Sequence, residues 1–128
     1  NKTESTAVWQ ATATPTGASR SWDGAFNTAL MTSSAAATYV NGLTDGGFSD
    51  WYLPSIDELS SLWHSRLTTN KALNAIGGAT LLSNTAVYWS STEYSTTCAY
   101  LFDFFNGYAT NFDFDKTNTF SVRAVRAF

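Results

Sequence analysis

The sequence has little of what catalytic and metal-binding proteins commonly use. Its one cysteine, Cys98, cannot form an internal disulfide, and its one histidine, His64, excludes sites that need paired histidine ligands. A serine-histidine-aspartate triad would depend on His64, which lies in a helical pattern and is better interpreted as a hydrogen-bonded helical residue. We interpret Cys98 as a small, buried apolar side chain. No set of acid, base and nucleophile emerges, so we expect that the protein is not an enzyme.

Charged residues are also scarce. The chain has seven Lys and Arg residues against ten Asp and Glu residues, which gives a formal net charge of -3. Nucleic-acid binding needs clustered cations, so we expect no nucleic-acid partner. No apolar run approaches the length of a membrane span, so we expect no direct membrane insertion. The chain opens without a basic-then-apolar leader, so we expect any targeting segment to lie outside this sequence.

Apolar residues are abundant by contrast. Hydrophobic residues make up 44% and aromatic residues 16% of the 128 positions, a composition that predicts one folded domain and argues against disorder. We divide the chain into residues 1–20, a lead-in segment rich in Thr, Ser and Ala with a first short strand near 7–12, and residues 21–128, the main domain.

Helical signals occupy the first half of the main domain. A helix over 33–42 begins at Ser33 or Ser34, and Gly42 suits a left-handed closing residue. Ser55 and Glu58 form a capping box for a second helix. The apolar residues of this helix repeat at three and four positions and predict one buried face: Ile56, Leu59, Leu62, Trp63 and Leu67. Residues 70–77 indicate a further short helix capped by Asn70.

Strand patterns replace the helical period from residue 85 onward. Residues 86–94, 98–105, 108–114 and 119–128 indicate four strands, with a tight turn over 115–118. The order predicts an α+β fold in which two or three short helices precede a twisted antiparallel sheet.

One predicted hairpin, over residues 98–115, is apolar on both faces. If Asn106 and Gly107 form a two-residue turn, Phe105 pairs with Tyr108, Asp103 with Thr110 and Leu101 with Phe112. The opposite face carries Tyr100, Phe102 and Phe104. Successive strand residues point to opposite sides, so both faces need a covering layer or a partner.

Three motifs resemble a known family. "GGFSDWYLPSIDEL", "YWSSTEY" and "VRAVRAF" occur in this order and resemble the Lcl C-terminal domain family from about Gly46 to Phe128. The resemblance implies a C-type-lectin-like fold at the end of a bacterial surface protein, such as the Legionella collagen-like adhesins. It therefore implies an extracellular or cell-surface location. Tyr52 departs from the arginine that is common at its position in the family.

The resemblance also assigns the two hairpin faces. It implies that Tyr100, Phe102 and Phe104 face the core. The other face is then left for a ligand or for an oligomer contact: Leu101, Asp103, Phe105, Tyr108, Thr110 and Phe112. Collagen-like stalks are trimeric, so we expect a homotrimer that buries this face.

The resulting prediction is a non-catalytic adhesin head that recognises sulfated glycans, in particular glycosaminoglycans. Sulfates need cations, and the candidate ligand-binding residues are Arg20, Arg66, Lys71, Lys116, Arg123 and Arg126. The alternative is a retroelement-diversified receptor with the same fold that binds protein ligands, since the resemblance implies that in related diversified proteins this same C-terminal segment is the hypervariable binding surface.

Structural roles are expected for several other polar residues. We expect Arg123 or Arg126 to pair with Asp50 or Glu93, and the run from Ser90 to Glu93 to make structural hydrogen bonds. We expect no cofactor. Oxygen ligands for calcium occur at Asp103, Asn106, Asn111, Asp113 and Asp115. Their irregular spacing predicts at most a weak divalent cation site.

Overall fold

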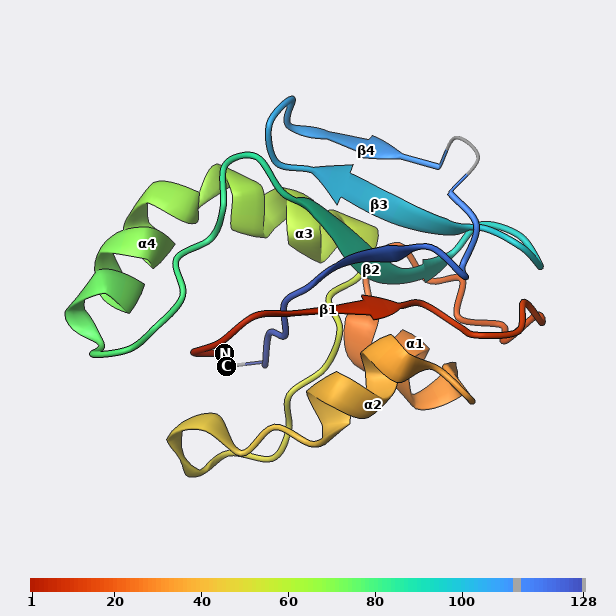
Figure 1. Cartoon of the computed structure of the whole chain (residues 1–128), viewed down its shortest axis with the longest axis horizontal. Coiled ribbons are helices and arrows are strands. Elements are labelled where there is room, and N and C mark those ends of the chain that lie inside the picture. Colours follow the sequence, from red (N-terminus) through yellow and green to blue (C-terminus); the bar gives the residue numbers. More distant parts are fainter. Residues whose placement is uncertain (112–113, 128) are drawn as a thin grey trace.

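The computed structural model describes residues 1–111 and 114–127 and has an α+β fold (Figure 1). The sheet has five strands in the order β1-β5-β2-β3-β4. Their bounds are β1 Ser5–Val8, β2 Val87–Glu93, β3 Ala99–Asp103, β4 Tyr108–Thr110 and β5 Thr119–Val122. In the described part of the chain the helices are α1 Gly24–Leu30, α2 Ala35–Asn41, α3 Ile56–His64 and α4 Arg66–Ala75, with a 3-10 turn η1 over Asp45–Gly47.

The prediction of a purely antiparallel sheet is wrong, because β2 and β5 are parallel through the pair Tyr88 and Ser121. Asp115, ahead of β5, forms an isolated antiparallel bridge with Cys98, just ahead of β3. Strand β5 lies between β2 and β1, and pairs antiparallel with β1.

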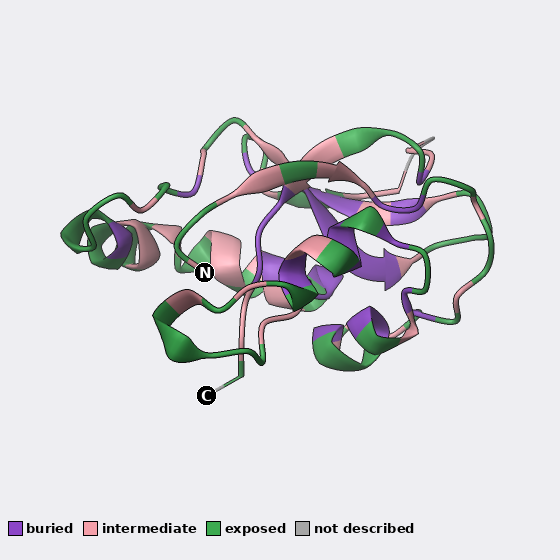
Figure 2. Ribbon diagram, turned by 60° about the horizontal axis from the view of Figure 1, so that its bottom comes forward, coloured by how far each residue is buried: buried purple, intermediate pink, exposed green. Residues whose placement is uncertain are grey.

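Helices cover both faces of the sheet, which explains the two apolar faces of the β3 strand. Trp89 and Leu101 pack with the residues of α2 and with Trp9 in one core cluster. Tyr88 and Phe102 pack with Ile56 and Leu59 of α3 in a second cluster. Figure 2 shows the buried residues gathered on the central strands and on the helix sides that face them. Leu101 is fully buried, so its assignment to a ligand or oligomer face is wrong.

Local helix signals agree with the structure where a cap is complete. Ser34 caps α2 and Ser55 with Glu58 makes the predicted capping box of α3. Gly42 closes α2 in a right-handed conformation, with φ −84°, so the left-handed prediction is wrong. Helix α1, capped by Asp23, was not predicted.

The predicted bounds of the last helix are wrong. The chain bends at Ser65 and a new helix, α4, begins at Arg66, so Asn70 lies inside it and is not its cap. The Asn70 side chain instead binds the backbone N–H and C=O of Leu82. The bend turns Leu67 away from the α3 face, and it is 68% exposed where burial was predicted.

The β3–β4 hairpin is two residues out of its predicted register. Asp103 pairs with Tyr108 and Leu101 with Thr110, so the connection has four residues. The Asp103 carboxylate holds this turn by accepting from the backbone N–H groups of Phe105 and Asn106. A shift of two residues keeps every side chain on its predicted face.

Candidate ligand-binding groove

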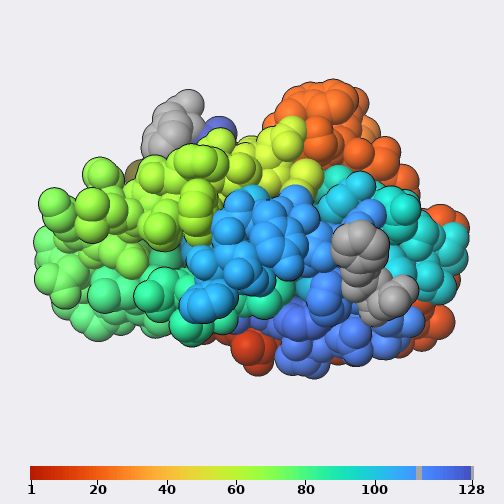
Figure 3. Space-filling model, turned by 90° about the horizontal axis from the view of Figure 1, so that it is seen from above, coloured from red at the N-terminus to blue at the C-terminus, as the bar shows by residue number. Residues whose placement is uncertain are grey.

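A groove of about 480 Å³ lies between α3 and the β3–β4 edge of the sheet. Its walls come from the segment before α1, the first turns of α3, the end of β2 and the β3–β4 hairpin. The lining residues are Ser19, Ser21, Ile56, Asp57, Ser60, Thr92, Glu93, Tyr94, Tyr100, Phe102, Gly107, Tyr108 and Ala109. Figure 3 looks onto this face, where the blue atoms of the hairpin lie beside the yellow-green atoms of α3. We name it the tyrosine groove.

Three tyrosines give the groove its aromatic surface. Tyr100 alternates with buried Leu101 on β3 and therefore points to the α3 side of the sheet. The ring of Tyr94 meets that of Tyr100 edge to face, with centroids 5.4 Å apart and planes at 80°. Tyr108, at the start of β4, is 52% exposed. The rings form walls at nearly right angles, a geometry that can hold a flat-faced ligand.

Hydroxyl groups line the same groove without internal partners. Within residues 1–111 and 114–127, no hydrogen bond is made by the side-chain hydroxyls of Ser19, Ser60, Tyr94, Tyr100 and Tyr108. Ser21 Oγ, at 2.7 Å, is the donor to the Asp57 carboxylate among the described residues. These groups are available to a ligand that carries many hydroxyls, because hydroxyls both donate and accept.

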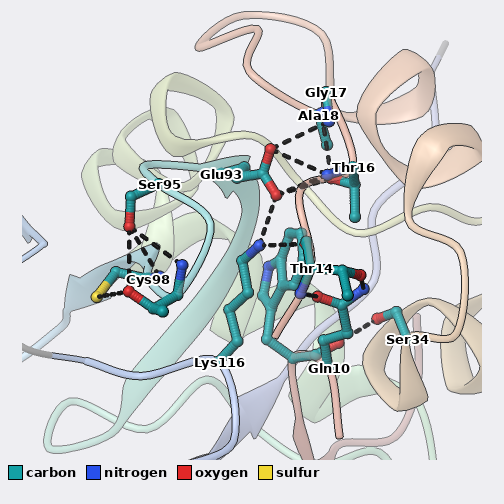
Figure 4. Close-up of polar contacts among 12 residues, drawn as sticks. Gln10, Thr14, Thr16, Gly17, Ala18, Ser34, Glu93, Ser95, Cys98 and Lys116 are labelled. Carbon is teal, nitrogen blue, oxygen red and sulfur yellow. Dashed lines mark hydrogen bonds and ion pairs between the residues drawn. The ribbon is translucent and has the colours of Figure 1, made fainter. Parts of the chain in front are cut away.

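The described lining residues include no Lys, Arg or His. Glu93, at the groove's edge, is neutralised from behind by Lys116 Nζ at 2.5 Å, which also donates to the Thr14 carbonyl at 2.9 Å (Figure 4). Burial alone would raise the pKa of Glu93, but hydrogen bonds from Lys116 and from the backbone of Thr16 and Gly17 hold it below its usual value. Asp57 thus carries the groove's uncompensated charge.

The predicted cationic face does not assemble from all six candidates. Lys116 is fully buried over the ring of Trp9, so its assignment to an outer face is wrong. Arg123 is buried too, donates to the Asn1 carbonyl and lies 3.6 Å from Glu4, so the same correction applies to it.

The other four candidates remain at the surface in different settings. Arg126 makes the predicted pair with Asp50, through two hydrogen bonds of 2.9 Å. Arg20 pairs with Asp23 at 2.8 Å. Arg66 and Lys71 lie on α4, where Arg66 stacks over Trp63 and Lys71 is exposed.

The predicted hairpin face is divided among several environments. Phe105 is 71% exposed at the turn, and Tyr108 contributes to the tyrosine groove. Asp103 is occupied by its own turn, and Thr110 is half-buried. Phe112 lies outside the described residues.

The sequence did not indicate Tyr94, Asp57, Ser19 or Ser60 as site residues. Tyr94 lay within a quoted motif, but nothing in the local pattern places it against Tyr100 or Asp57. The predicted structural role of the run from Ser90 to Glu93 is confirmed, since Ser90 Oγ donates to the Tyr100 carbonyl and Thr92 Oγ1 to that of Arg20.

The remaining candidate residues lie elsewhere. His64 is exposed, and its Nδ1 lies 2.8 Å from the Ser60 carbonyl. Cys98 is half-buried with its sulfur 3.6 Å from Thr97 Oγ1. Of the calcium candidates, Asp103 and Asp115 accept hydrogen bonds in their own turns, and Asp113 is outside the described residues. The described residues contain no cluster of three His, Cys, Asp or Glu side chains suited to a metal.

None of the helices in the described residues is long and apolar enough to cross a bilayer.

Comparison with known proteins addresses family and fold. No curated protein matches the chain. A crystallised fimbrial protein from Bacteroides ovatus has a similar fold, with a TM-score of 0.65 and 23% identity over 80% of this chain. The match spans 24% of that fimbrial protein. The model of the Lcl C-terminal domain matches residues 2–126, so its match begins within the predicted lead-in segment. With nearly its whole length matched, the chain belongs to the Lcl C-terminal domain family.

Proposed function

We propose that this domain is a non-catalytic binding head of a bacterial surface protein and that it binds carbohydrate in the tyrosine groove. The observation that carries the proposal is the combination of three tyrosine rings with unpartnered hydroxyls in one groove. Aromatic faces stack on the apolar faces of sugars, while hydroxyls and carboxylates bind sugar hydroxyls. Membership of the Lcl C-terminal domain family and the fold shared with a fimbrial protein support a surface location.

Binding without turnover is part of this proposal. The groove offers serine and tyrosine hydroxyls, but His64, the one histidine of the chain, is not among its lining residues. A serine needs an adjacent base to act as a nucleophile. Asp57 reaches Ser21, but no described lining residue could stabilise a developing oxyanion with a cationic side chain.

Sulfated glycosaminoglycans remain a second candidate ligand class, at another site. Helix α4 carries Arg66 and Lys71 and has no acidic residue, and within the described chain neither cation has a carboxylate partner. A sulfated chain would therefore dock along α4 and avoid the acidic groove. This sulfated-glycan site follows from the predicted adhesin function, and it uses Arg66 and Lys71, two of the six predicted cations.

A protein ligand is the third candidate, favoured by the exposed ring of Phe105. Together with Tyr108 it forms an aromatic tip on the hairpin that corresponds to the diversified segment of related receptors. The C-type-lectin-like fold and retroelement diversification belong to this reading, supported by the resemblance of the sequence motifs.

A glycan array that carries neutral, amino and sulfated oligosaccharides tests these alternatives. We expect binding to uncharged or amino glycans that is lost in Tyr108→Ala and retained in Phe105→Ala, a matched aromatic variant outside the groove. Binding only to sulfated glycans, lost when Arg66 and Lys71 are both changed to Gln, would move the site to α4. Absence of any glycan binding would defeat the carbohydrate proposal and favour a protein ligand.

A further inference from the structure

Asp57, a lining carboxylate of the tyrosine groove, has no cationic partner within the described part of the chain. Asp57 accepts a hydrogen bond from Ser21 Oγ, and its backbone N–H donates to the Ser21 carbonyl at 3.0 Å. These two contacts fix Asp57 at the groove wall but leave acceptor capacity on its carboxylate, which can accept about four hydrogen bonds.

The described side chains that line the groove supply no cation to Asp57. Glu58 follows it in the first turn of α3, and the described lining residues include no basic side chain. The N-terminal end of α3 offsets part of the charge but forms no ion pair. The other lining carboxylate, Glu93, already has Lys116 as its partner. A ligand with a positive group would therefore complete the groove, and an acidic ligand would be repelled.

We propose that the groove selects an amino sugar with a free amine, whose ammonium group pairs with Asp57. This inference rests on the proposed carbohydrate function and specifies its ligand class. Tyr94 and Tyr100 supply faces that attract both the sugar ring and a nearby cation. Ser19 and Ser60 are the hydroxyl partners within the same groove.

Titration with three matched sugars, followed by nuclear magnetic resonance, tests the inference. We expect D-glucosamine to bind about fivefold more tightly than D-glucose or N-acetyl-D-glucosamine, the gain expected of one surface ion pair. Asp57→Asn retains an acceptor for Ser21 and should reduce the affinity for D-glucosamine to that for D-glucose. Asp50→Asn, a surface carboxylate variant whose partner Arg126 also lies outside the groove, should leave all three affinities unchanged.

Other outcomes separate this inference from the proposed function. Equal affinity for the three sugars would keep the carbohydrate function and overturn the ammonium site. A preference for D-glucosamine that survives Asp57→Asn would overturn the role of Asp57. Equally tight binding of Nα-acetyl-lysine amide would overturn selection for a sugar. Failure of every sugar to bind would overturn the proposed function as well.

Discussion

Gly107 shows how a single residue positions the groove. Its φ of 76° lies in the left-handed region, and an added Cβ would lie 2.4 Å from the ring of Trp63. Trp63 Nε1 in turn donates to the Phe104 carbonyl at 3.0 Å. The hairpin turn therefore packs tightly against α3 at Gly107, which also lines the groove, and glycine alone fits at this position.

We predict that Gly107→Ala lowers the free energy of unfolding by about 3 kcal/mol, because backbone strain and overpacking add. Gly77→Ala is the matched control, since nothing lies within 4 Å of a Cβ there. It should change stability by less than about 0.5 kcal/mol. Chemical denaturation measures both variants, and equal effects would contradict the proposed contact with Trp63.

The Glu93 and Lys116 pair predicts a dependence of stability on pH. The pKa of Glu93 is lower in the folded protein than in the unfolded chain. The ionised carboxylate therefore stabilises the fold fully at pH values above the ordinary pKa of glutamate, and this stabilisation is lost as the pH falls through the lowered pKa. We predict that Glu93→Gln costs about 2 kcal/mol at pH 7, because Lys116 stays buried without a carboxylate.

Denaturation of both proteins at neutral and acidic pH tests the pair. The difference in stability between wild type and Glu93→Gln should shrink as the pH falls through the lowered pKa of Glu93, where its carboxylate gains a proton. A difference that stays constant with pH would show that the Glu93 charge contributes nothing.

At the scale of elements, Glu58 joins two helices. Its carboxylate accepts from Ser55 N–H at 2.8 Å within the capping box of α3 and from Gly24 N–H at 3.1 Å at the start of α1. The hydroxyl of Tyr52 donates to the other carboxylate oxygen at 2.9 Å. Burial is the larger cause and this hydrogen bond the second cause of the raised pKa of Tyr52. The tyrosine thus supplies a donor at the position where the family commonly has arginine.

We predict that Glu58→Ala destabilises the protein by about 2 kcal/mol, more than the loss of one cap, because both helix starts lose an acceptor. Asp23→Ala removes the cap of α1 and the surface ion pair with Arg20, and should cost less because exposed ion pairs contribute little. Thermal unfolding ranks the two variants. An equal or larger effect of Asp23→Ala would contradict the joint role of Glu58.

Elements could be predicted where their signals are local. The Ser55 and Glu58 box lies within four residues, so it was found. Asp23 was not predicted as a cap because the residues after it do not repeat apolar side chains at helical spacing. The register of the hairpin failed since Asp103, and not the Asn106-Gly107 pair, organises the turn.

At the scale of the whole molecule, the groove could not be predicted because it joins distant segments. Asp57 meets Ser21, and Tyr94 meets Tyr100, only after α3 packs against the sheet. The cations were misplaced for a related reason. Lys116 and Arg123 appear as surface residues by type, but carboxylates from Glu93 and Glu4 make their burial tolerable.

Packing of the whole molecule also bears on its assembly. The apolar hairpin that motivated the homotrimer prediction has an explanation within one chain, because α2 and α3 cover opposite faces of the sheet. Of the described hairpin residues, Phe105 retains the largest exposed aromatic surface. Phe105 and Tyr108, the two exposed rings of the hairpin, bury far less area than a stable interface, which needs about 800 Å² per partner.

We therefore predict that the isolated domain is a monomer in solution, with a mass near 13.9 kDa by light scattering at micromolar concentration. Phe105→Ala should leave that mass unchanged, since no interface depends on the ring. A mass three times larger in the wild type, which falls to the monomer value in Phe105→Ala, would establish the trimer and place its contact at the hairpin tip. If the domain is a monomer, a longer protein could still be a trimer, because a collagen-like stalk would impose threefold assembly without a contact between the domains.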